Sequence, residues 1–414
     1  MDRSKATPRP KVGSQTGERL SAIPALTGLR FFAAVWVVLH HWGIWLVAFP
    51  PIVRLYPQQG KAGVSLFFVV SGFVLVYNYY PHFSAGLGGY ASFIQARLAR
   101  IYPLYLLGLI LLTPVTLTFL NSQAIHSTLS RMALAISWLS NLMMLQAWIP
   151  NDTFSRIWNG ASWSISDEIA FYLLLPFFIY LVLSRITALR SLITLLVLLW
   201  IVQVVLVVGT AIAVEKTRFL AENNLLYKNP LYRVWEFLLG ATLARILLSQ
   251  RKQLLDWNDR LPHRSVFRNV PVSLSLLILL VLPPLLARAS SRLPFLSAED
   301  NYVIFTPVFG LLILGLALRT SFIAPLIESR LVVRLGEASY SLYMVHWLPL
   351  TALRLLAERG HRAPTAPWLA INAAVICLTV CASLWLYQHV EAPARRTLRP
   401  RPGAGEGHVK LLPP

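Results

Sequence analysis

Two ionisable side chains stand out in one apolar stretch near the start of the chain. Arg30 is followed by FFAAVWVVL and then by His40 and His41. On an α-helix, the eleven positions from Arg30 to His41 make about three turns, so both side chains face the same way, about 16 Å apart. A neutral imidazole is suited to accept a hydroxyl proton near pH 7. Because ionisable groups in lipid are costly, they indicate function by default, and His41 is a candidate general base.

The alternative for this pair of histidines is that both lie at the outer end of the helix, in water and without a role. His40 and His41 are adjacent, so on a helix they point about 100° apart. Two imidazoles in that arrangement chelate a metal poorly, and we expect no metal site.

A second group of polar residues opens a later apolar stretch. Ser164, Glu168 and Tyr172 are spaced four residues apart and share one face of a helix. The neighbouring Asp167 adds a second acid. The alternative is that Asp167 and Glu168 are ordinary first-turn acids that complement the positive end of a helix.

A pair of arginines precedes another apolar stretch. Arg97 and Arg100 are one helical turn apart in the sequence RLARIYP. Guanidinium groups bind phosphate oxygens in a bidentate manner, so the pair suits a phosphate or pyrophosphate ligand. The alternative is a simple anchor of basic residues at the cytoplasmic surface of a membrane.

Two further segments place polar groups in apolar surroundings. Arg233 and Glu236 are three residues apart and can pair within one helix. The segment 335–346 contains Tyr340 and brings a second histidine, His346, into an apolar stretch. Each of these groups has the alternative of a packed polar contact between helices.

The composition indicates which elements must position these residues. Of the 414 residues, 56% are hydrophobic and 13% are charged, against about a quarter charged in soluble domains. The net charge of +20 does not indicate nucleic-acid binding, because the basic residues lie mainly between apolar stretches, as the positive-inside rule expects. We therefore predict an all-α polytopic membrane protein without a nucleic-acid partner. The two cysteines, Cys377 and Cys381, fit a packed helix face.

Hydropathy predicts ten membrane-spanning helices. They cover residues 26–48, 62–80, 98–120, 164–184, 189–214, 231–249, 270–288, 302–319, 340–357 and 367–389. Residues 131–149 are apolar but carry Ser, Asn and Gln, so this segment is an eleventh span, a re-entrant helix or an interfacial helix. Ten spans place the basic loops on one side, with cytoplasmic tails at 1–22 and 392–414 around one membrane domain at 23–391.

Taken in order, these segments resemble acyltransferase family 3, whose members O-acylate extracytoplasmic acceptors. Arg30 and His41 match the family's arginine, ten residues, histidine pattern, and Arg97 and Arg100 match its R-x-x-R-I-x-P segment. Residues 63–73, which include Ser71, are similar to G-V-x-L-F-F-x-x-S-G-F, with Ser65 where an aspartate is common. Residues 163–172 resemble W-S-L-S-x-E-x-x-F-Y, with Ile169 and Ala170 in place of the usual Glu-Gln. Phe237 to Gly240 and residues 336–346 match further blocks, and residues 391–393 resemble the E-x-P ending.

The resemblance implies an acyltransferase with no bound cofactor that takes an acyl group, often acetyl, from cytoplasmic acyl-CoA. His41 would promote attack on the thioester, oriented by Arg30 or stabilised by Glu168, and Arg97 and Arg100 would hold the CoA phosphates. Both an acyl-histidine and direct deprotonation of the acceptor fit this role. The acceptor would be a glycan or glycolipid such as O-antigen, exopolysaccharide or peptidoglycan, or a macrolide sugar. A bacterial cytoplasmic membrane and a separate periplasmic acyl-transfer partner fit the same picture.

Two other classes remain open on the sequence alone. A transporter or flippase of lipid-linked glycans would place polar sites on broken helices and often shows internal repeats. A non-catalytic membrane scaffold would have little use for histidines and paired acids along apolar spans.

Overall fold

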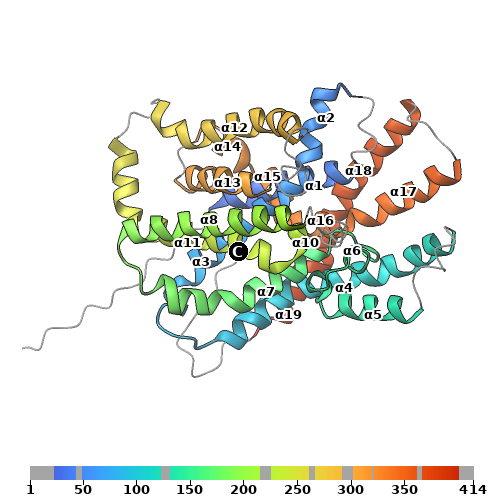
Figure 1. The fold of residues 1–414 in the computed structure, drawn as a ribbon, viewed down its shortest axis with the longest axis horizontal. Coiled ribbons are helices and arrows are strands. Elements are labelled where there is room, and N and C mark those ends of the chain that lie inside the picture. Colours follow the sequence, from blue (N-terminus) through green and yellow to red (C-terminus); the bar gives the residue numbers. More distant parts are fainter. Residues whose placement is uncertain are drawn as a thin grey trace, which may run out of the picture.

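The computed structural model describes eight segments of the chain. They are residues 23–42, 49–122, 131–214, 225–260, 266–290, 302–318, 321–360 and 366–400. The predicted tail at 1–22 and the end of the predicted tail at 392–414 lie outside the described residues. Helices make up the secondary structure of these segments, as predicted (Figure 1).

The helices follow one another without strands between them in the described segments. In chain order they are α1 Pro24–His41, α2 Pro51–Gln58, η2 Gln59–Lys61, α3 Ala62–Phe83, α4 Tyr90–Ser122, α5 Arg131–Leu142, η4 Gln146–Trp148, α6 Asp152–Arg156, α7 Trp163–Phe178, η5 Ile179–Leu183, α8 Leu189–Val214, α10 Leu225–Lys228, α11 Pro230–Arg260, α12 Val266–Ser290, α13 Tyr302–Ala317, α14 Ala324–Ile327, α15 Arg330–Glu337, α16 Ser339–Val345, α17 Trp347–Gly360, α18 Ala366–Leu386, η7 Tyr387–Glu391 and α19 Ala392–Thr397.

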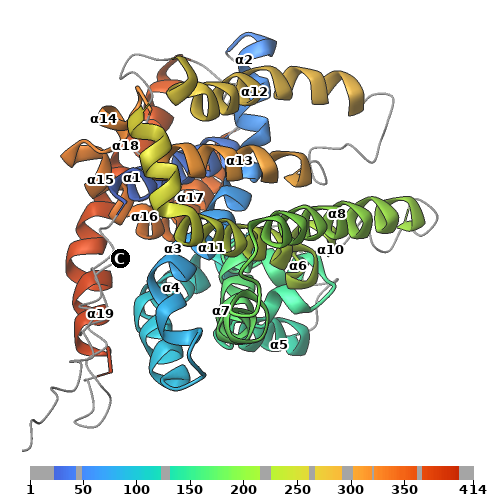
Figure 2. The same cartoon turned by 90° about the vertical axis from the view of Figure 1, so that its left-hand side faces the viewer.

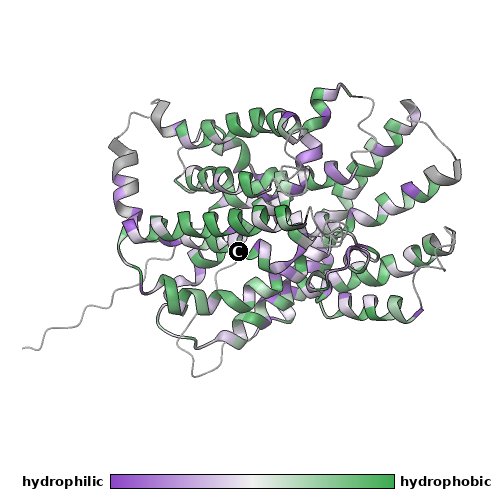
Figure 3. Ribbon diagram, viewed as in Figure 1, coloured by the Kyte–Doolittle hydropathy of each residue, from purple (hydrophilic) through white to green (hydrophobic). Residues whose placement is uncertain are grey.

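Within the described residues, six helices are long and apolar enough to cross a membrane. They are Pro51–Phe83, Tyr90–Thr118, Trp163–Leu183, Leu189–Ala213, Asn269–Ser290 and Pro367–Thr397. Apolar residues run along most of the length of α8, α12 and α13 (Figure 3), and large apolar side chains such as Leu198 and Val205 are exposed on α8. A face of this kind is stable against lipid. The protein is an all-α polytopic membrane protein.

The other four predicted spans, of which residues 43–48 and 319 lie outside the described residues, are helical where the structure describes them but depart from a long, uniformly apolar helix. α1 carries Arg30 and two histidines, and the apolar half of α11 carries Arg233, Glu236 and Arg245. α13 has 16 residues. The predicted span at 340–357 is divided at His346 into α16 and α17. Polar groups thus interrupt the bundle where the candidate site residues lie.

The ambiguous segment 131–149 does not form a spanning helix. α5 has 12 residues, a length of about 18 Å, whereas the hydrocarbon core is about 30 Å thick. The chain then turns at Met144, whose φ is 55°. Gln146 is fully buried, and its Nε2 donates to Tyr105 Oη and to the carbonyl of Ser162, each at 3.0 Å. The eleventh-span alternative is therefore wrong, and the segment is a short helix followed by a buried polar turn.

Glycine allows α3 and α11 to approach each other backbone to backbone. A Cβ on Gly72 would lie 1.9 Å from the carbonyl oxygen of Phe237, and a Cβ on Gly240 would lie 2.0 Å from that of Val69. Such interfaces of small residues replace the hydrophobic driving force that is missing between helices in lipid. These glycines fix the position of α3, which carries Ser65 and Ser71, relative to α11, which carries Arg233.

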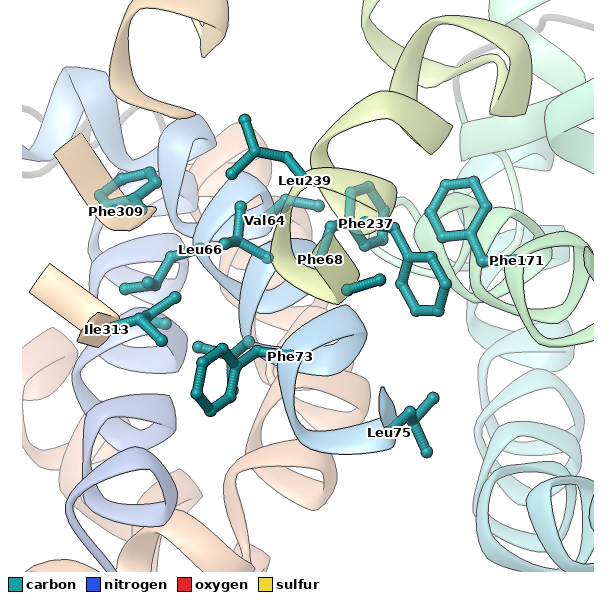
Figure 4. Packing of buried hydrophobic residues seen from close by; sticks show 14 of the residues in the cluster. Val64, Leu66, Phe68, Phe73, Leu75, Phe171, Phe237, Leu239, Phe309 and Ile313 are labelled. Atoms are coloured by element: carbon teal, nitrogen blue, oxygen red, sulfur yellow. The ribbon is translucent and has the colours of Figure 1, made fainter. Parts of the chain in front are cut away.

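Aromatic side chains fill the space between α3, α7 and α11. The ring of Phe171 lies 5.1 Å from that of Phe68 and 5.2 Å from that of Phe237 between centroids. The three side chains point toward one another from three different helices (Figure 4). This contact fixes α7, and with it Ser164 and Glu168, against the α3–α11 pair.

The cysteines of α18 do not pack in the interior. Cys377 and Cys381 are free and exposed, so the expectation of a packed face was wrong. Few residues of the long helix that runs from α18 to α19 are buried in the bundle, and both helices lie at the edge of the molecule in Figure 2.

Candidate active site

His41 at the end of α1 contacts the second predicted histidine directly. His41 Nδ1 lies 2.9 Å from His346 Nε2, and the two rings stack at 5.0 Å between centroids. Trp347 packs its ring edge-on against His41, also at 5.0 Å. His346 is fully buried. His41 is therefore held by ring contacts from His346, which joins α16 to α17, and from the first residue of α17. These contacts disfavour the alternative of an idle, fully hydrated side chain.

When both rings are neutral, the hydrogen-bond partners of these histidines determine which ring nitrogen carries the proton. His346 Nδ1 lies 2.7 Å from the carbonyl oxygen of Tyr343. Because a carbonyl oxygen only accepts, His346 Nδ1 carries the proton, and its Nε2 is an acceptor. His41 Nδ1 must then donate to His346 Nε2, which leaves His41 Nε2 as an unprotonated nitrogen. A proton acceptor of this kind is what general base catalysis requires.

Ser164 on α7 is linked to the same stretch of α16. Its Oγ lies 2.8 Å from Tyr343 Oη, and that hydroxyl donates to the carbonyl oxygen of Ala161 at 2.9 Å. Tyr343 therefore joins α16 to the start of α7 through its hydroxyl, while its carbonyl holds His346. Sequence reasoning did not single out Tyr343, although it lies inside the segment 335–346.

Glu168 receives two hydrogen bonds on the same carboxylate oxygen. Ser71 Oγ donates to Oε1 at 3.1 Å, and Tyr172 Oη donates to it from one turn further along α7. α7 begins at Trp163, so Glu168 lies beyond the first turn. The alternative of a first-turn acid at a helix end is therefore disfavoured. The contact between Glu168 and Tyr172 was predicted from their spacing, and Ser71 joins the same group.

Arg30 belongs to the Glu168 group and not to the histidine pair. Arg30 interacts electrostatically with Arg100, Glu168, Tyr172 and Glu391. His41 instead interacts electrostatically with His346, His40, Arg354 and Lys61. The helix α1 thus separates two sets of groups, and the structure gives no direct contact by which Arg30 would orient His41.

The end of α1 that carries Arg30 collects arginines from other helices. Arg100 interacts electrostatically with Tyr172, Glu391, Glu168 and Tyr387. Arg97 donates from Nη2 to Tyr79 Oη at 3.3 Å and stacks over that ring. Ser341 Oγ donates to Glu391 Oε2 at 2.7 Å. Cations and carboxylates from α1, α4, α7 and η7 therefore meet in one region.

Comparison with known protein families identifies the family of the chain. The model of an acyltransferase domain, Acyl_transf_3, matches residues 23–388. The chain belongs to acyltransferase family 3. This acyltransferase is 28% identical over 418 residues to the acyltransferase MdmB of Streptomyces mycarofaciens, an alignment that covers 93% of the chain and 95% of that protein.

Two longer relatives carry more specific names. The O-acetyltransferase OatA of Staphylococcus aureus is 24% identical over 387 residues, or 90% of the chain and 57% of that protein. The putative peptidoglycan O-acetyltransferase YrhL of Bacillus subtilis is 24% identical over 382 residues, or 90% of the chain and 55% of that protein. The acyltransferase thus spans little more than half the length of these two. No solved structure matches.

A third polar group of the acyltransferase is completely buried. Arg233 Nη2 pairs with Glu236 Oε2 at 3.1 Å and donates to Ser65 Oγ at 3.0 Å. The side chains of both charged partners are inaccessible to solvent, and Arg233 lies 3.9 Å from the ring centroid of Tyr302. Thus the predicted pair exists, but as a buried contact among α3, α11 and α13. It supports packing of the bundle and does not reach His41 or Glu168 directly.

Tyr340 also serves packing in this structure. It is buried, and its hydroxyl donates to the carbonyl oxygen of Ile101 at 2.7 Å. Ile101 follows Arg100 directly, so Tyr340 fixes α16 to the arginine-bearing part of α4. Tyr340 therefore positions a neighbour of the candidate site.

A buried ion pair outside the spans holds the turn after α5 in place. Lys228 at the end of α10 pairs with Asp152 at the start of α6 and donates to Ser155 Oγ at 3.1 Å. Burial lowers the pKa of Lys228 to about 8, and the Asp152 carboxylate opposes this change. Sequence reasoning missed this pair, because neither residue stands in a recognisable spacing with the other.

Proposed function

We propose that this acyltransferase moves an acyl group from a cytoplasmic acyl-CoA donor to a hydroxyl group of an extracytoplasmic carbohydrate. The observation that carries the proposal is the chain from the Tyr343 carbonyl through His346 to His41, which leaves His41 Nε2 free to accept a proton. His41 would be the catalytic residue, and His346 a positioning residue. The relatives that are named O-acetyltransferases support an acetyl donor and a glycan acceptor.

In the proposed reaction one nitrogen atom, His41 Nε2, first accepts a proton and later returns it. His41 Nε2 accepts the hydroxyl proton as the acceptor oxygen forms a bond to the thioester carbonyl carbon. The carbon–sulfur bond then breaks, and the leaving thiolate takes the proton from His41. An acyl-imidazole route would use the same nitrogen as the nucleophile. In either case the products are the acylated acceptor and free CoA thiol, without a further cofactor.

The two ends of α1 match the two ends of such a donor. In coenzyme A the thioester sits on a long pantetheine arm, remote from the pyrophosphate and the 3′-phosphate. Arg30 and His41 lie about 16 Å apart along the helix, with arginines Arg97 and Arg100 near the former. Arg97 and Arg100 would bind phosphate oxygens, while His41 would meet the thioester. Glu168 and Arg30 would line the path between them.

Membrane placement follows from the same proposal. The basic residues between spans favour both termini in the cytoplasm of a bacterium, with the protein in the cytoplasmic membrane. The donor phosphates would then bind on the cytoplasmic side and the acceptor would approach His41 from outside. A separate periplasmic partner would accept the acyl group if the acceptor lies beyond reach.

The proposal is tested by acyl transfer in reconstituted membranes. Purified protein in proteoliposomes receives acetyl-CoA labelled in the acetyl group, and cell-envelope glycans or soluble glycosides are offered as acceptors. Mass spectrometry should find one added acetyl unit on a glycan hydroxyl. Movement of a glycan across the membrane without acyl-CoA, and with no acylated product, would instead support the flippase alternative.

Replacement of His346 separates a positioning role from a purely structural one. We expect His346→Phe to lower kcat roughly 10- to 100-fold. The His41 Nδ1–H loses its acceptor, so the His41 ring is no longer held in the tautomer that leaves Nε2 unprotonated. His346→Gln offers an amide oxygen to the same N–H and should recover part of the loss. Measured pH profiles of kcat should change in His346→Phe. Equal loss in both variants with an unchanged profile would contradict the positioning role.

A further inference from the structure

An arginine that follows the E-x-P ending joins the arginines of the candidate donor site. Arg395 on α19 interacts electrostatically with Arg100, Arg97 and Glu391. α19 packs against α4, and Gln95 Nε2 on α4 donates to the carbonyl oxygen of Leu398 at 3.3 Å, just beyond α19. The last helix therefore lies along the part of α4 that bears Arg97 and Arg100.

The cluster has more positive charge than its carboxylates neutralise. Four guanidinium groups, those of Arg30, Arg97, Arg100 and Arg395, gather with two carboxylates, those of Glu168 and Glu391. Both carboxylates already accept hydrogen bonds from neighbouring hydroxyls. Bringing four like charges together is unfavourable unless an anion completes the cluster.

The donors of these arginines are largely free. Among the described residues, no side-chain hydrogen bond or ion pair within 4 Å involves Arg30, Arg100 or Arg395. Arg97 Nε is buried and has no hydrogen-bond partner. A guanidinium group carries five N–H donors in a planar fork that matches phosphate oxygens. Guanidinium groups with unpaired N–H donors and a surplus of positive charge are suited to bind a ligand with several phosphate groups.

We propose that Arg395 is a further donor-binding residue, which contacts a phosphate group of the acyl donor together with Arg97 and Arg100. This inference rests on the proposed function and extends the donor site from α4 to the C-terminal helix α19. The ligand class is a nucleotide thioester with several phosphate charges, and Arg395 acts on its binding, not on the chemical step.

The next residue along the chain provides a matched control. Arg396 carries the same charge but is exposed, whereas Arg395 is half-buried. Arg395→Gln and Arg396→Gln remove the same charge from neighbouring positions of one helix. A general effect of net charge would change both variants equally.

The test measures binding by calorimetry with the full chain in nanodiscs of zwitterionic lipid. We expect Arg395→Gln to weaken coenzyme A binding roughly tenfold, the typical loss of one charged hydrogen bond, and Arg396→Gln to change it less than about twofold. S-acetyl pantetheine, which has no phosphate beyond the arm, should bind all three proteins alike. In turnover, Arg395→Gln should raise KM for acetyl-CoA and leave kcat unchanged.

Each other result has a defined meaning. Unchanged coenzyme A affinity in Arg395→Gln, or an equal loss with S-acetyl pantetheine, would overturn the assignment of Arg395. A defect that emerges only in discs with anionic lipid would show that the phosphate belongs to a lipid headgroup, which also overturns it. Failure of the unaltered protein to bind coenzyme A would instead refute the proposed acyl-CoA donor, so the two failures are distinguishable.

Discussion

Replacement of His41 by glutamine is expected to lower kcat for acyl transfer roughly 10²- to 10⁴-fold, the usual contribution of a general base. Glutamine keeps an amide N–H that can donate to His346 Nε2, so the contact between α1 and α16 can persist. What is lost is the unprotonated ring nitrogen His41 Nε2. The measurement is initial-rate transfer of labelled acetyl from acetyl-CoA in proteoliposomes, with protein amount and folding checked by size-exclusion chromatography.

The adjacent histidine supplies the control for this experiment. His40 has the same side chain one position earlier, and its Nδ1 lies 3.1 Å from the carbonyl oxygen of Pro57. His40→Gln should retain kcat within about threefold, because His40 Nδ1 contacts the Pro57 carbonyl of α2 and not His346. Coenzyme A binding should be unchanged in both variants. Full activity in His41→Gln would remove His41 from the reaction.

Local spacing made part of the site predictable from sequence. Residues three or four apart on a helix are neighbours, and Glu168 does contact Tyr172 while Arg233 does pair with Glu236. The helical character of most apolar runs was predictable for the same reason, since it depends on consecutive residues. These contacts depend on the geometry of one helix and on nothing else in the fold.

Contacts between distant segments could not be predicted in this way. His41 and His346 are 305 positions apart, and periodicity says nothing about which helices become neighbours. Both histidines were candidates, yet the sequence paired His41 with Arg30 on the same helix, whereas Arg30 lies with Glu168 and Arg100. The turn at Met144 was equally hidden, because hydropathy measures apolar length and not where a backbone reverses.

The second large effect concerns the packing that holds these distant segments together. We expect Gly72→Ala and Gly240→Ala each to destabilise the protein by at least about 3 kcal/mol, the upper range for overpacked interiors. Each new methyl group would lie about 2 Å from a backbone carbonyl oxygen of the facing helix, that of Phe237 or Val69. Backbone atoms cannot rotate away as a flexible side chain can, so α3 and α11 would have to separate.

Separation of α3 from α11 would displace Ser71 from Glu168 and Ser65 from Arg233, so acyl transfer should be lost together with stability. The measurement is the midpoint of thermal unfolding in detergent, monitored through the fraction of protein that remains monodisperse after heating. Gly209→Ala is the matched control, because its added Cβ would meet no atom of a neighbouring helix within 4 Å. Alanine favours a helix by up to about 1 kcal/mol over glycine, so Gly209→Ala should keep or raise the midpoint. Normal stability and activity in Gly72→Ala and Gly240→Ala would mean that α3 and α11 do not pack as closely as described, and the positions of Glu168 and Arg233 would have to be revised with them.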